Sequence, residues 1–224
     1  MKQDVKKALK DTIPVFSGYM VLGMGFGILM QSKGYGVLWT LAMSALIYAG
    51  SMQYLAVDLL AGGASLISAA LTTLLVNARH LFYGISMVDR YKGAGKKKPY
   101  LIFALTDETY SLVCNTEGSH GYCFLVSLFN QIWWVSGSVL GSLLGSVLPF
   151  STEGIDFALT ALFVTVFVEQ WKNTKDHVPA TVGVVASAVC LLLFGADGFL
   201  IPAMVAITAA LSLLKLLRRE VRHD

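Results

Sequence analysis

Long apolar segments recur along the whole chain, and this feature constrains the fold more than any other. We distinguish eight of them, at residues 12–31, 37–60, 63–88, 100–116, 122–148, 155–171, 178–195 and 199–217. The sequence is 55% hydrophobic and only 14% charged, whereas soluble domains carry about 25% charged residues. Such a chain can bury its apolar surface in a bilayer, so we predict an all-α, polytopic transmembrane helical bundle.

The stretches between the apolar segments are too short for a separate soluble domain, and we expect residues 1–224 to form one integral membrane domain. The basic start "MKQDVKKALKDTIP" resembles the flank of a signal peptide. The apolar segment behind it contains glycines suited to helix packing and no small-residue cleavage site. We therefore interpret it as a first span that is retained.

The sequence also indicates which classes of function to set aside. It contains no nucleotide-binding loop, no HExxH and no GxSxG motif, so we predict neither an enzyme nor a cofactor. The net charge is only +3, and the basic residues lie at segment ends, which is typical of membrane topology rather than of nucleic-acid binding. Because ATP would have to be bound by another subunit, an ion gradient is the simpler energy source.

Positive charges gather in the N-terminal tail, in the loop at residues 89–99 and in the C-terminal tail. They are Lys2, Lys6, Lys7 and Lys10; Arg90, Lys92, Lys96, Lys97 and Lys98; and Lys215, Arg218, Arg219 and Arg222. The positive-inside rule places all three clusters, and both termini, in the cytoplasm. Three apolar segments separate the first cluster from the second and five separate the second from the third, although both numbers should be even.

Two segments that enter and leave the membrane on the same side would remove this disagreement. The natural candidates are 37–60, interrupted by "YAGSMQY", and 100–116, interrupted by "TDETY". Broken helices of this kind are tolerated where they line a cavity. We expect six to eight apolar segments in the bundle, with these two broken or re-entrant. The alternative is six to eight plain spans with one exceptional loop.

Short sequence matches suggest an internal repeat. "SGYMVLG" at 17–23 resembles "SGSVLG" at 136–141, and "MQY" at 52–54 resembles "EQW" at 169–171. Repeats of about three spans are common in transporters, although such short matches also arise by chance.

Glycines four residues apart form a second pattern. They are Gly23 and Gly27 in one segment, and Gly137, Gly141 and Gly145 in another. Small residues at this spacing let helix backbones approach closely. They indicate either packing within the chain, which we favour, or an interface with a partner subunit.

Charged residues stand inside two apolar segments. Arg79 and His80, with Asn77 beside them, lie within 64–88, and Asp107 and Glu108 lie within 100–116. An ionisable residue at bilayer depth costs on the order of 3 kcal/mol or more unless it faces protein or water. These residues therefore need a structural or functional reason.

Their spacing predicts that they meet. Arg79 lies ten residues before Asp89, and Asp107 lies eight residues after Pro99. If 64–88 and 100–116 pack as an antiparallel pair of helices, both charges lie roughly 12 to 15 Å deep, near the midplane. We expect Arg79 and His80 to face Asp107 or Glu108.

One arginine neutralises one acid, so a carboxylate and a histidine remain. Such groups can carry a proton or bind an ammonium group. The structural alternative is a buried ion pair that locks two helices. Other polar residues of the apolar segments, Gln53, Asn130 and Gln131, are weaker signals that we interpret as hydrogen bonds between helices.

The elements "P-x-F-x-G-Y", "YAGSMQ", "NARHLFYG" and "TDETY", in this order and spacing, resemble the AzlC-type family, the large subunit of bacterial branched-chain amino acid exporters. The resemblance covers about residues 12–200 and is strongest from Tyr48 to Tyr110. It implies a secondary exporter of hydrophobic amino acids in the bacterial cytoplasmic (inner) membrane. It also implies a small, separately encoded AzlD-type membrane subunit as partner.

A zwitterion with an apolar side chain needs an anionic contact, a cationic or helix-N-terminal contact, and an apolar pocket. We predict Asp107 or Glu108 for the ammonium, and Arg79 or a broken-helix N-terminus for the carboxylate. The pocket is expected to include Tyr48, Met52 and Tyr83. The candidate substrate-binding or coupling residues are thus Arg79, His80, Asp107, Glu108, Asn77, Gln53, Tyr48 and Tyr83.

Three alternatives stay open at this point. The first is a transporter of a different small solute, and the second is an intramembrane metal-binding protein with His80, Asp107 and Glu108 as ligands. The third is a scaffold whose charges only pin helices. In a scaffold, Asp107→Asn and Glu108→Gln would deplete the protein, whereas in a transporter they would remove activity at normal abundance.

Overall fold

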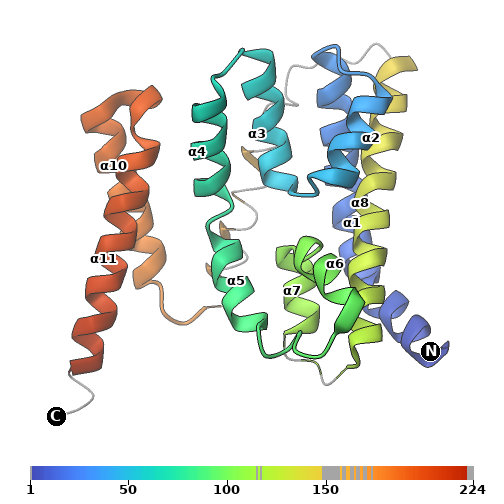
Figure 1. The fold of residues 1–224 in the computed structure, drawn as a ribbon. Coiled ribbons are helices and arrows are strands. Elements are labelled where there is room, and N and C mark those ends of the chain that lie inside the picture. The colour runs from blue at the N-terminus through green and yellow to red at the C-terminus, as the bar shows by residue number, and fades with distance from the viewer. Residues whose placement is uncertain are drawn as a thin grey trace. The chain divides into compact units, whose positions relative to one another are not determined.

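The computed structural model describes the chain at residues 2–114, 116, 118–147, 157, 160–161, 164, 167–168, 171–172 and 174–220 (Figure 1). Within these residues all regular structure is helical, which confirms the predicted all-α fold. The chain forms two compact units, Met1–Leu162 and Phe163–Asp224. A single membrane domain that includes both units stays a prediction.

Two long helices form the centre of the first unit. α1 (Lys2–Ser32) and α8 (His120–Val147) are both long and apolar enough to cross a membrane. They pack against each other along their length and run in the same direction (Figure 1). All other described helices of this unit are shorter.

Glycines bring α1 and α8 into close contact. A Cβ atom on Gly27 would collide with the backbone of Ser138. One on Gly141 would collide with the backbone of Met24. Backbone atoms cannot rotate away as the end of a flexible side chain can, so the close approach requires glycine at both positions. The glycine pattern therefore packs within the chain, as the favoured interpretation predicts.

The first segment predicted to be broken forms two short helices. α2 (Val37–Leu46) and α3 (Gly50–Ala61) are separated at Tyr48, whose φ of 46° lies in the left-handed region. Gly50 starts α3 against the indole of Trp134, where a Cβ atom would lie 3.1 Å from the ring. The chain turns here instead of continuing as one span.

The two short helices form a hairpin with both ends on one side. The Thr40 hydroxyl of α2 donates to Ser142 Oγ (3.3 Å). The Ala45 carbonyl, later in α2, accepts from Gln131 Nε2 (3.0 Å), which lies earlier in α8. α2 therefore runs antiparallel to α8, and α3 returns to the end of the unit at which α2 begins (Figure 1).

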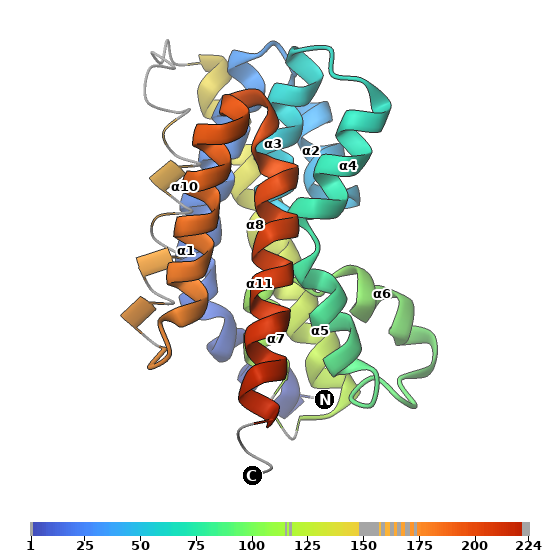
Figure 2. The same cartoon turned by 90° about the vertical axis from the view of Figure 1, so that its left-hand side faces the viewer.

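The next segment is divided as well. α4 (Leu66–Val76) and α5 (Arg79–Met87) follow each other in one direction, with α4 above α5 in both Figure 1 and Figure 2. At the break the His80 amide donates to the Asn77 carbonyl (2.9 Å), a contact of the tighter i+3 kind. The single helix over 64–88 that the antiparallel pairing assumed is therefore divided in two, although the two helices together are long enough for one crossing.

The second segment predicted to be broken forms another hairpin. After the short turn of helix η1 (Gly95–Lys97), α6 (Lys98–Phe103) leads away from the loop at 89–99, and α7 (Asp107–Val113) returns towards that end (Figure 1). Thr106 caps α7, because its Oγ1 accepts a hydrogen bond from the Thr109 amide (3.3 Å). Both segments expected to reverse direction therefore do so.

Two of the three basic clusters lie at the same end of this unit. The Lys7 ammonium lies 4.9 Å from the ring centroid of Tyr122, and the Lys97 ammonium lies 5.9 Å from that of Phe124. Both rings belong to the start of α8. Because the α2–α3 hairpin returns to its own side, the number of crossings between the two clusters becomes even, and the positions of these two clusters agree with the fold.

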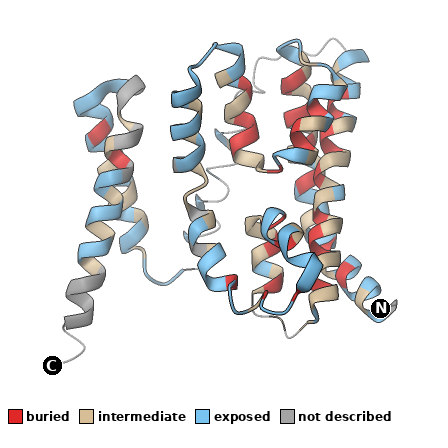
Figure 3. Cartoon of the chain, in the orientation of Figure 1, coloured by how far each residue is buried: buried red, intermediate tan, exposed pale blue. Residues whose placement is uncertain are grey.

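Burial is uneven across the first unit. Figure 3 shows buried residues concentrated on α1, α2, α3 and α8, whereas α4 is almost entirely exposed. Its exposed side chains are apolar, with Leu66 and Ile67 at 89% and 75% exposure. Such a surface suits contact with lipid.

The second unit contains two long described helices that pack against each other, α10 (Val178–Gly198) and α11 (Leu200–Glu220). Residues Val178–Gly195 are long and apolar enough to cross a membrane. Gly195, with φ of 71°, interrupts the end of α10. The segment 155–171, predicted to be apolar and helical, lies mostly outside the described residues.

Candidate functional site

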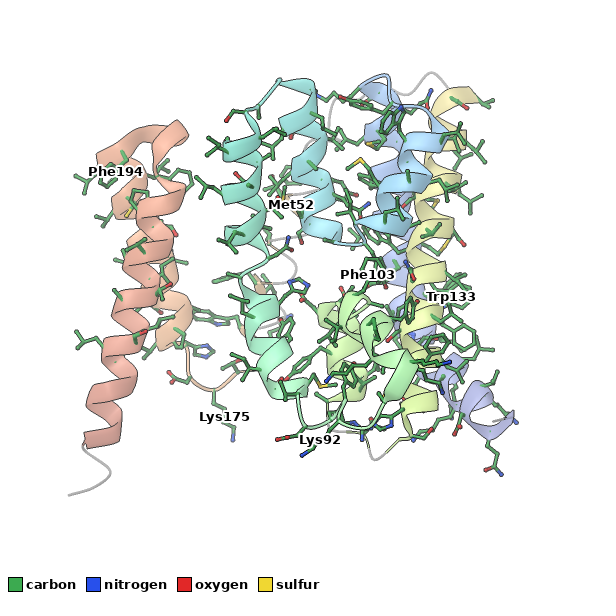
Figure 4. All side chains as sticks on the ribbon, in the orientation of Figure 1. Met52, Lys92, Phe103, Trp133, Lys175 and Phe194 are labelled. Atoms are coloured by element: carbon green, nitrogen blue, oxygen red, sulfur yellow. The ribbon has the colours of Figure 1, made fainter. Side chains whose placement is uncertain are left out.

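The tips of the two hairpins meet in the first unit. The rings of Tyr48, at the tip of α2–α3, and Phe103, at the tip of α6–α7, have centroids 6.2 Å apart. Tyr48 and Ala104 also belong to one buried cluster with Tyr19 of α1 and Trp134 of α8. In Figure 4, Phe103 lies at the tip of the α6–α7 hairpin and Met52 near that of α2–α3. The meeting point is near the middle of both long helices.

Glu108 is held at this point by α1. The Tyr19 hydroxyl donates to Glu108 Oε2 at 2.6 Å, and the same hydroxyl lies 2.9 Å from Thr106 Oγ1. Tyr19 is buried and Glu108 is half-buried. A short hydrogen bond to a carboxylate is among the stronger ones in proteins, so it ties the α6–α7 tip to α1.

Hydrogen bonds continue from Thr106 towards α8. Thr106 Oγ1 donates to Thr109 Oγ1 (3.1 Å), which also accepts from Asn130 Nδ2 (3.0 Å). The other amide atom, Asn130 Oδ1, is buried and has no hydrogen-bond partner among the described residues. The carboxyl group of Glu108 is therefore one end of a polar chain that crosses the core between α1 and α8.

Tyr48 has two unusual properties. It is the one described residue other than glycine with positive φ, a conformation that is uncommon for a bulky side chain. Its side chain is only 4% exposed, yet its hydroxyl has no hydrogen-bond partner among the described residues. The hydroxyl lies close to Tyr19, Thr106 and Glu108. The structure therefore places this hydroxyl next to the polar chain of Glu108, Tyr19 and Thr106.

α5 and α7 lie next to each other and run in the same direction. The rings of Tyr83 and Tyr110 are stacked at 4.5 Å, and Ser86 Oγ donates to the Tyr110 hydroxyl (3.1 Å). The first residues of the two helices, Arg79 and Asp107, therefore start at the same level. Similar depth was predicted, but the antiparallel pairing behind it is wrong, because the chain reverses at 104–106 before it reaches the acids.

The remaining predicted residues are placed as follows. His80 is half-buried, with Nδ1 3.2 Å from the Asn77 carbonyl and its ring 5.8 Å from that of Tyr83. Asp107 is half-buried at the first turn of α7. The Arg79 side chain lies outside the description, so its pairing with an acid stays a prediction.

Gln53 binds to neighbouring helices rather than facing an open space. Its Oε1 accepts from Trp134 Nε1 (3.0 Å), and its Nε2 donates to Ser44 Oγ (3.4 Å). The side chain is completely buried. These contacts support the interpretation of Gln53 as a bond between helices, and they position the start of α3 against α8.

Sequence reasoning did not select three residues of the site, Tyr19, Thr106 and Thr109. Tyr19 stands in the "P-x-F-x-G-Y" element, and Thr106 precedes two acids as helix caps often do, so both carried a signal. Asn130 was predicted only to form a hydrogen bond between helices. In the structure its Nδ2 donates to Thr109 Oγ1, so it also belongs to the site.

A metal centre receives no support from the geometry. Within the part of the chain that the structure describes, no three histidine, cysteine or acidic side chains are grouped so that they could hold a metal ion. His80, Asp107 and Glu108, the ligands of the metal-binding alternative, are all described. The oxygen-rich site between the tips fits hydrogen bonding and charge recognition.

Comparison with known proteins adds an independent observation. The family described as "AzlC protein" matches residues 14–148, more than half of the chain. The branched-chain amino acid transport protein AzlC of Bacillus subtilis is 44% identical over 94% of this chain and 85% of the relative. The chain belongs to the AzlC family.

More distant AzlC-family relatives are also membrane proteins. An uncharacterized membrane protein of Helicobacter pylori (strain 26695) is 42% identical over 94% of each chain, and the inner membrane protein YgaZ of Escherichia coli is 29% identical over 83% of this chain and 80% of the relative. No solved structure matches the chain. The AzlC match and the apolar helices together identify a membrane transporter.

Proposed function

We propose that this protein is a secondary exporter of branched-chain and other hydrophobic amino acids across the bacterial cytoplasmic membrane. The observation that carries the proposal is the meeting of two hairpin tips around Glu108, near the middle of two membrane-length helices. Transporters bind substrates at broken helices near the midplane. The name of the Bacillus subtilis relative supports the choice of substrate.

In the proposed binding mode, the substrate ammonium contacts Asp107 or Glu108 at the start of α7. The carboxylate lies at Arg79 or at the N-terminus of α3, which begins at the hairpin tip without a side-chain cap. The positive end of a helix dipole favours an anion there. Tyr48 and Met52, both buried at the α2–α3 tip, supply the apolar wall.

Glu108 is also the proposed coupling group. Its carboxylate accepts the short hydrogen bond from Tyr19, and a proton on that oxygen would remove the charge which strengthens the bond. Protonation would therefore loosen the α6–α7 tip from α1. A hairpin released in this way opens the site on one side, which is the step that alternating access requires.

Two further features of the proposal rest on the resemblance and on the charge pattern. A small AzlD-type subunit is the expected partner. The N-terminal tail and the loop at 89–99, which share one end of the first unit, are expected to face the cytoplasm. The C-terminal tail is expected on the same side.

Efflux of preloaded labelled leucine tests the proposal. The chain would be expressed with and without a candidate small subunit in cells lacking their own exporters. Glu108→Gln should abolish efflux at equal membrane abundance. Asp58→Asn is the matched control, because Asp58 is 60% exposed and only forms a surface pair with Lys33 (3.8 Å), so efflux should be unchanged.

The outcomes separate the alternatives. Depletion of the Glu108→Gln protein would indicate that the carboxylate only holds the fold. Efflux of a different solute, found with a panel of amino acids and other small solutes, would keep the transporter but change the substrate. Full leucine efflux by Glu108→Gln would exclude this carboxylate from the transport cycle.

A further inference from the structure

A pocket of about 350 Å³ lies between α5 and α6, outside the hairpin-tip site. Met87 of α5 and Ile102 of α6 contribute to its apolar walls. Leu105, in the turn at the α6–α7 tip, lies at one end, and Lys98, the first residue of α6, lies at the other. The pocket therefore extends from the basic loop at 89–99 to the level of the tips.

Two basic residues and one tyrosine supply the polar groups of this pocket. Lys98 and His80 both line it, and so does Tyr91, whose buried hydroxyl has no hydrogen-bond partner among the described residues. No aspartate or glutamate does so among the described residues. A ligand here can place an anionic group near a cation but finds no carboxylate for an ammonium, so the pocket favours a carboxylate with an apolar body.

The size of the pocket limits the ligand. Small-molecule pockets range from about 300 to 1,000 Å³, and this one is near the lower limit. A branched-chain amino acid fits such a volume, whereas a two-chain phospholipid is much larger. α5 also leaves room for a ligand at Gly84, because a Cβ atom there would meet no atom within 4 Å.

We propose that the α5–α6 pocket is a capture site, which binds the exported amino acid by its carboxylate at Lys98 before the amino acid reaches the hairpin tips. This inference rests on the proposed function. The two sites differ in chemistry, since the tips offer carboxylates to an ammonium and the pocket offers a cation to a carboxylate. A ligand without an ammonium group loses the contact with Asp107 or Glu108 at the tips, so it should bind the pocket much more tightly than the tips.

Two analogues of leucine separate the sites. 4-Methylpentanoate keeps the apolar chain and the carboxylate but lacks the ammonium, and 3-methylbutylamine keeps the chain and the ammonium but lacks the carboxylate. Binding of labelled 4-methylpentanoate would be measured on the purified full-length protein in nanodiscs of neutral phosphatidylcholine. We expect saturable binding that leucine displaces and 3-methylbutylamine does not.

Variants then locate the binding. Gly84→Leu fills the pocket and Lys98→Gln removes the cation, and each should weaken 4-methylpentanoate binding by about tenfold or more. Gly18→Leu is the control for the first, because a Cβ on Gly18 also meets nothing within 4 Å. Lys92→Gln is the control for the second, since Lys92 belongs to the same loop and does not line the pocket.

The failure of this inference can be told apart from that of the proposed function. Glu108→Gln should lose efflux and keep 4-methylpentanoate binding. Unchanged binding in Lys98→Gln, with the protein folded, would overturn the capture site even if export is confirmed. Loss of binding in nanodiscs with anionic phosphatidylglycerol, at constant ionic strength, would mean that a lipid headgroup occupies the pocket, and would overturn it as well.

Discussion

At the scale of single residues, Tyr48 combines a strained backbone with an unused polar group. The left-handed conformation of a non-glycine residue costs about 1–3 kcal/mol and persists only when its surroundings enforce it. Here the enforcement comes from burial in the cluster that contains Tyr19, Ala104 and Trp134. The packing fixes the Tyr48 hydroxyl at the tips, where no described residue takes it as a hydrogen-bond partner.

This contrast with a neighbouring tyrosine gives a prediction. Tyr54 is also buried, but its hydroxyl donates to the Leu22 carbonyl at 2.6 Å. Tyr54→Phe should lower the free energy of unfolding by about 1 kcal/mol because a hydrogen bond is lost. Tyr48→Phe should leave thermal stability unchanged and reduce leucine efflux roughly three- to tenfold. Unchanged efflux in Tyr48→Phe would remove its hydroxyl from the substrate site.

The sequence predicted some residues of the site better than others. Asp107, Glu108 and His80 were evident because charge is rare inside an apolar segment. The role of Tyr19 was not, since its partner Glu108 lies 89 residues away in sequence and a tyrosine in an apolar segment is ordinary. Pairing across such distances is decided by tertiary packing, which no local pattern contains.

At the scale of elements, the close contact between α1 and α8 depends on glycine. Both helices are long, apolar and parallel, so their backbones meet over several turns. The glycine spacing predicted a close helix contact, because residues four apart lie on one face of a helix, but it did not indicate which helices would meet. Only the fold shows that these glycines pack within the chain rather than against a partner subunit.

A pair of glycine substitutions tests this contact. Gly27→Ala should lower the thermal stability of the purified protein in detergent, by about 1–3 kcal/mol, because the new Cβ meets backbone atoms of α8 that cannot move aside. Gly18→Ala, on the same helix, meets nothing within 4 Å and should be neutral or slightly stabilising. Equal melting temperatures for the two variants would contradict the close packing.

The broken helices show where element prediction succeeds and where it fails. The breaks near Tyr48 and Ala104 were predicted because glycine, polar residues and the parity of the charge clusters all indicated them. The break at Asn77 and Ala78 was not, since the segment has neither glycine nor proline there and needs only a tighter turn.

At the scale of the whole molecule, the match to the AzlC family at residues 14–148 covers the hairpin core. The match includes both hairpins, α4, α5, α8 and the part of α1 from residue 14 onward, and it ends before the second unit begins. Tyr19, Tyr48, Glu108 and Asn130 all lie inside it. The site and the capture pocket therefore belong to the part of the chain that defines the family.

The arrangement of helices in this core predicts on which side of the membrane each loop lies, and this sidedness can be measured. In a variant without its three native cysteines, single cysteines would be placed at Lys6, Lys96, Lys33 and Ala64. Lys33 and Ala64 lie in the turns that precede α2 and follow α3. If α2–α3 is a hairpin, a membrane-impermeant maleimide applied to intact cells should label these two positions and neither Lys6 nor Lys96. If only one of Lys33 and Ala64 is labelled, α2–α3 crosses the membrane and is not a hairpin. If only one of Lys6 and Lys96 is labelled, the two basic clusters lie on opposite sides of the membrane. Either result would contradict the agreement between these clusters and the fold.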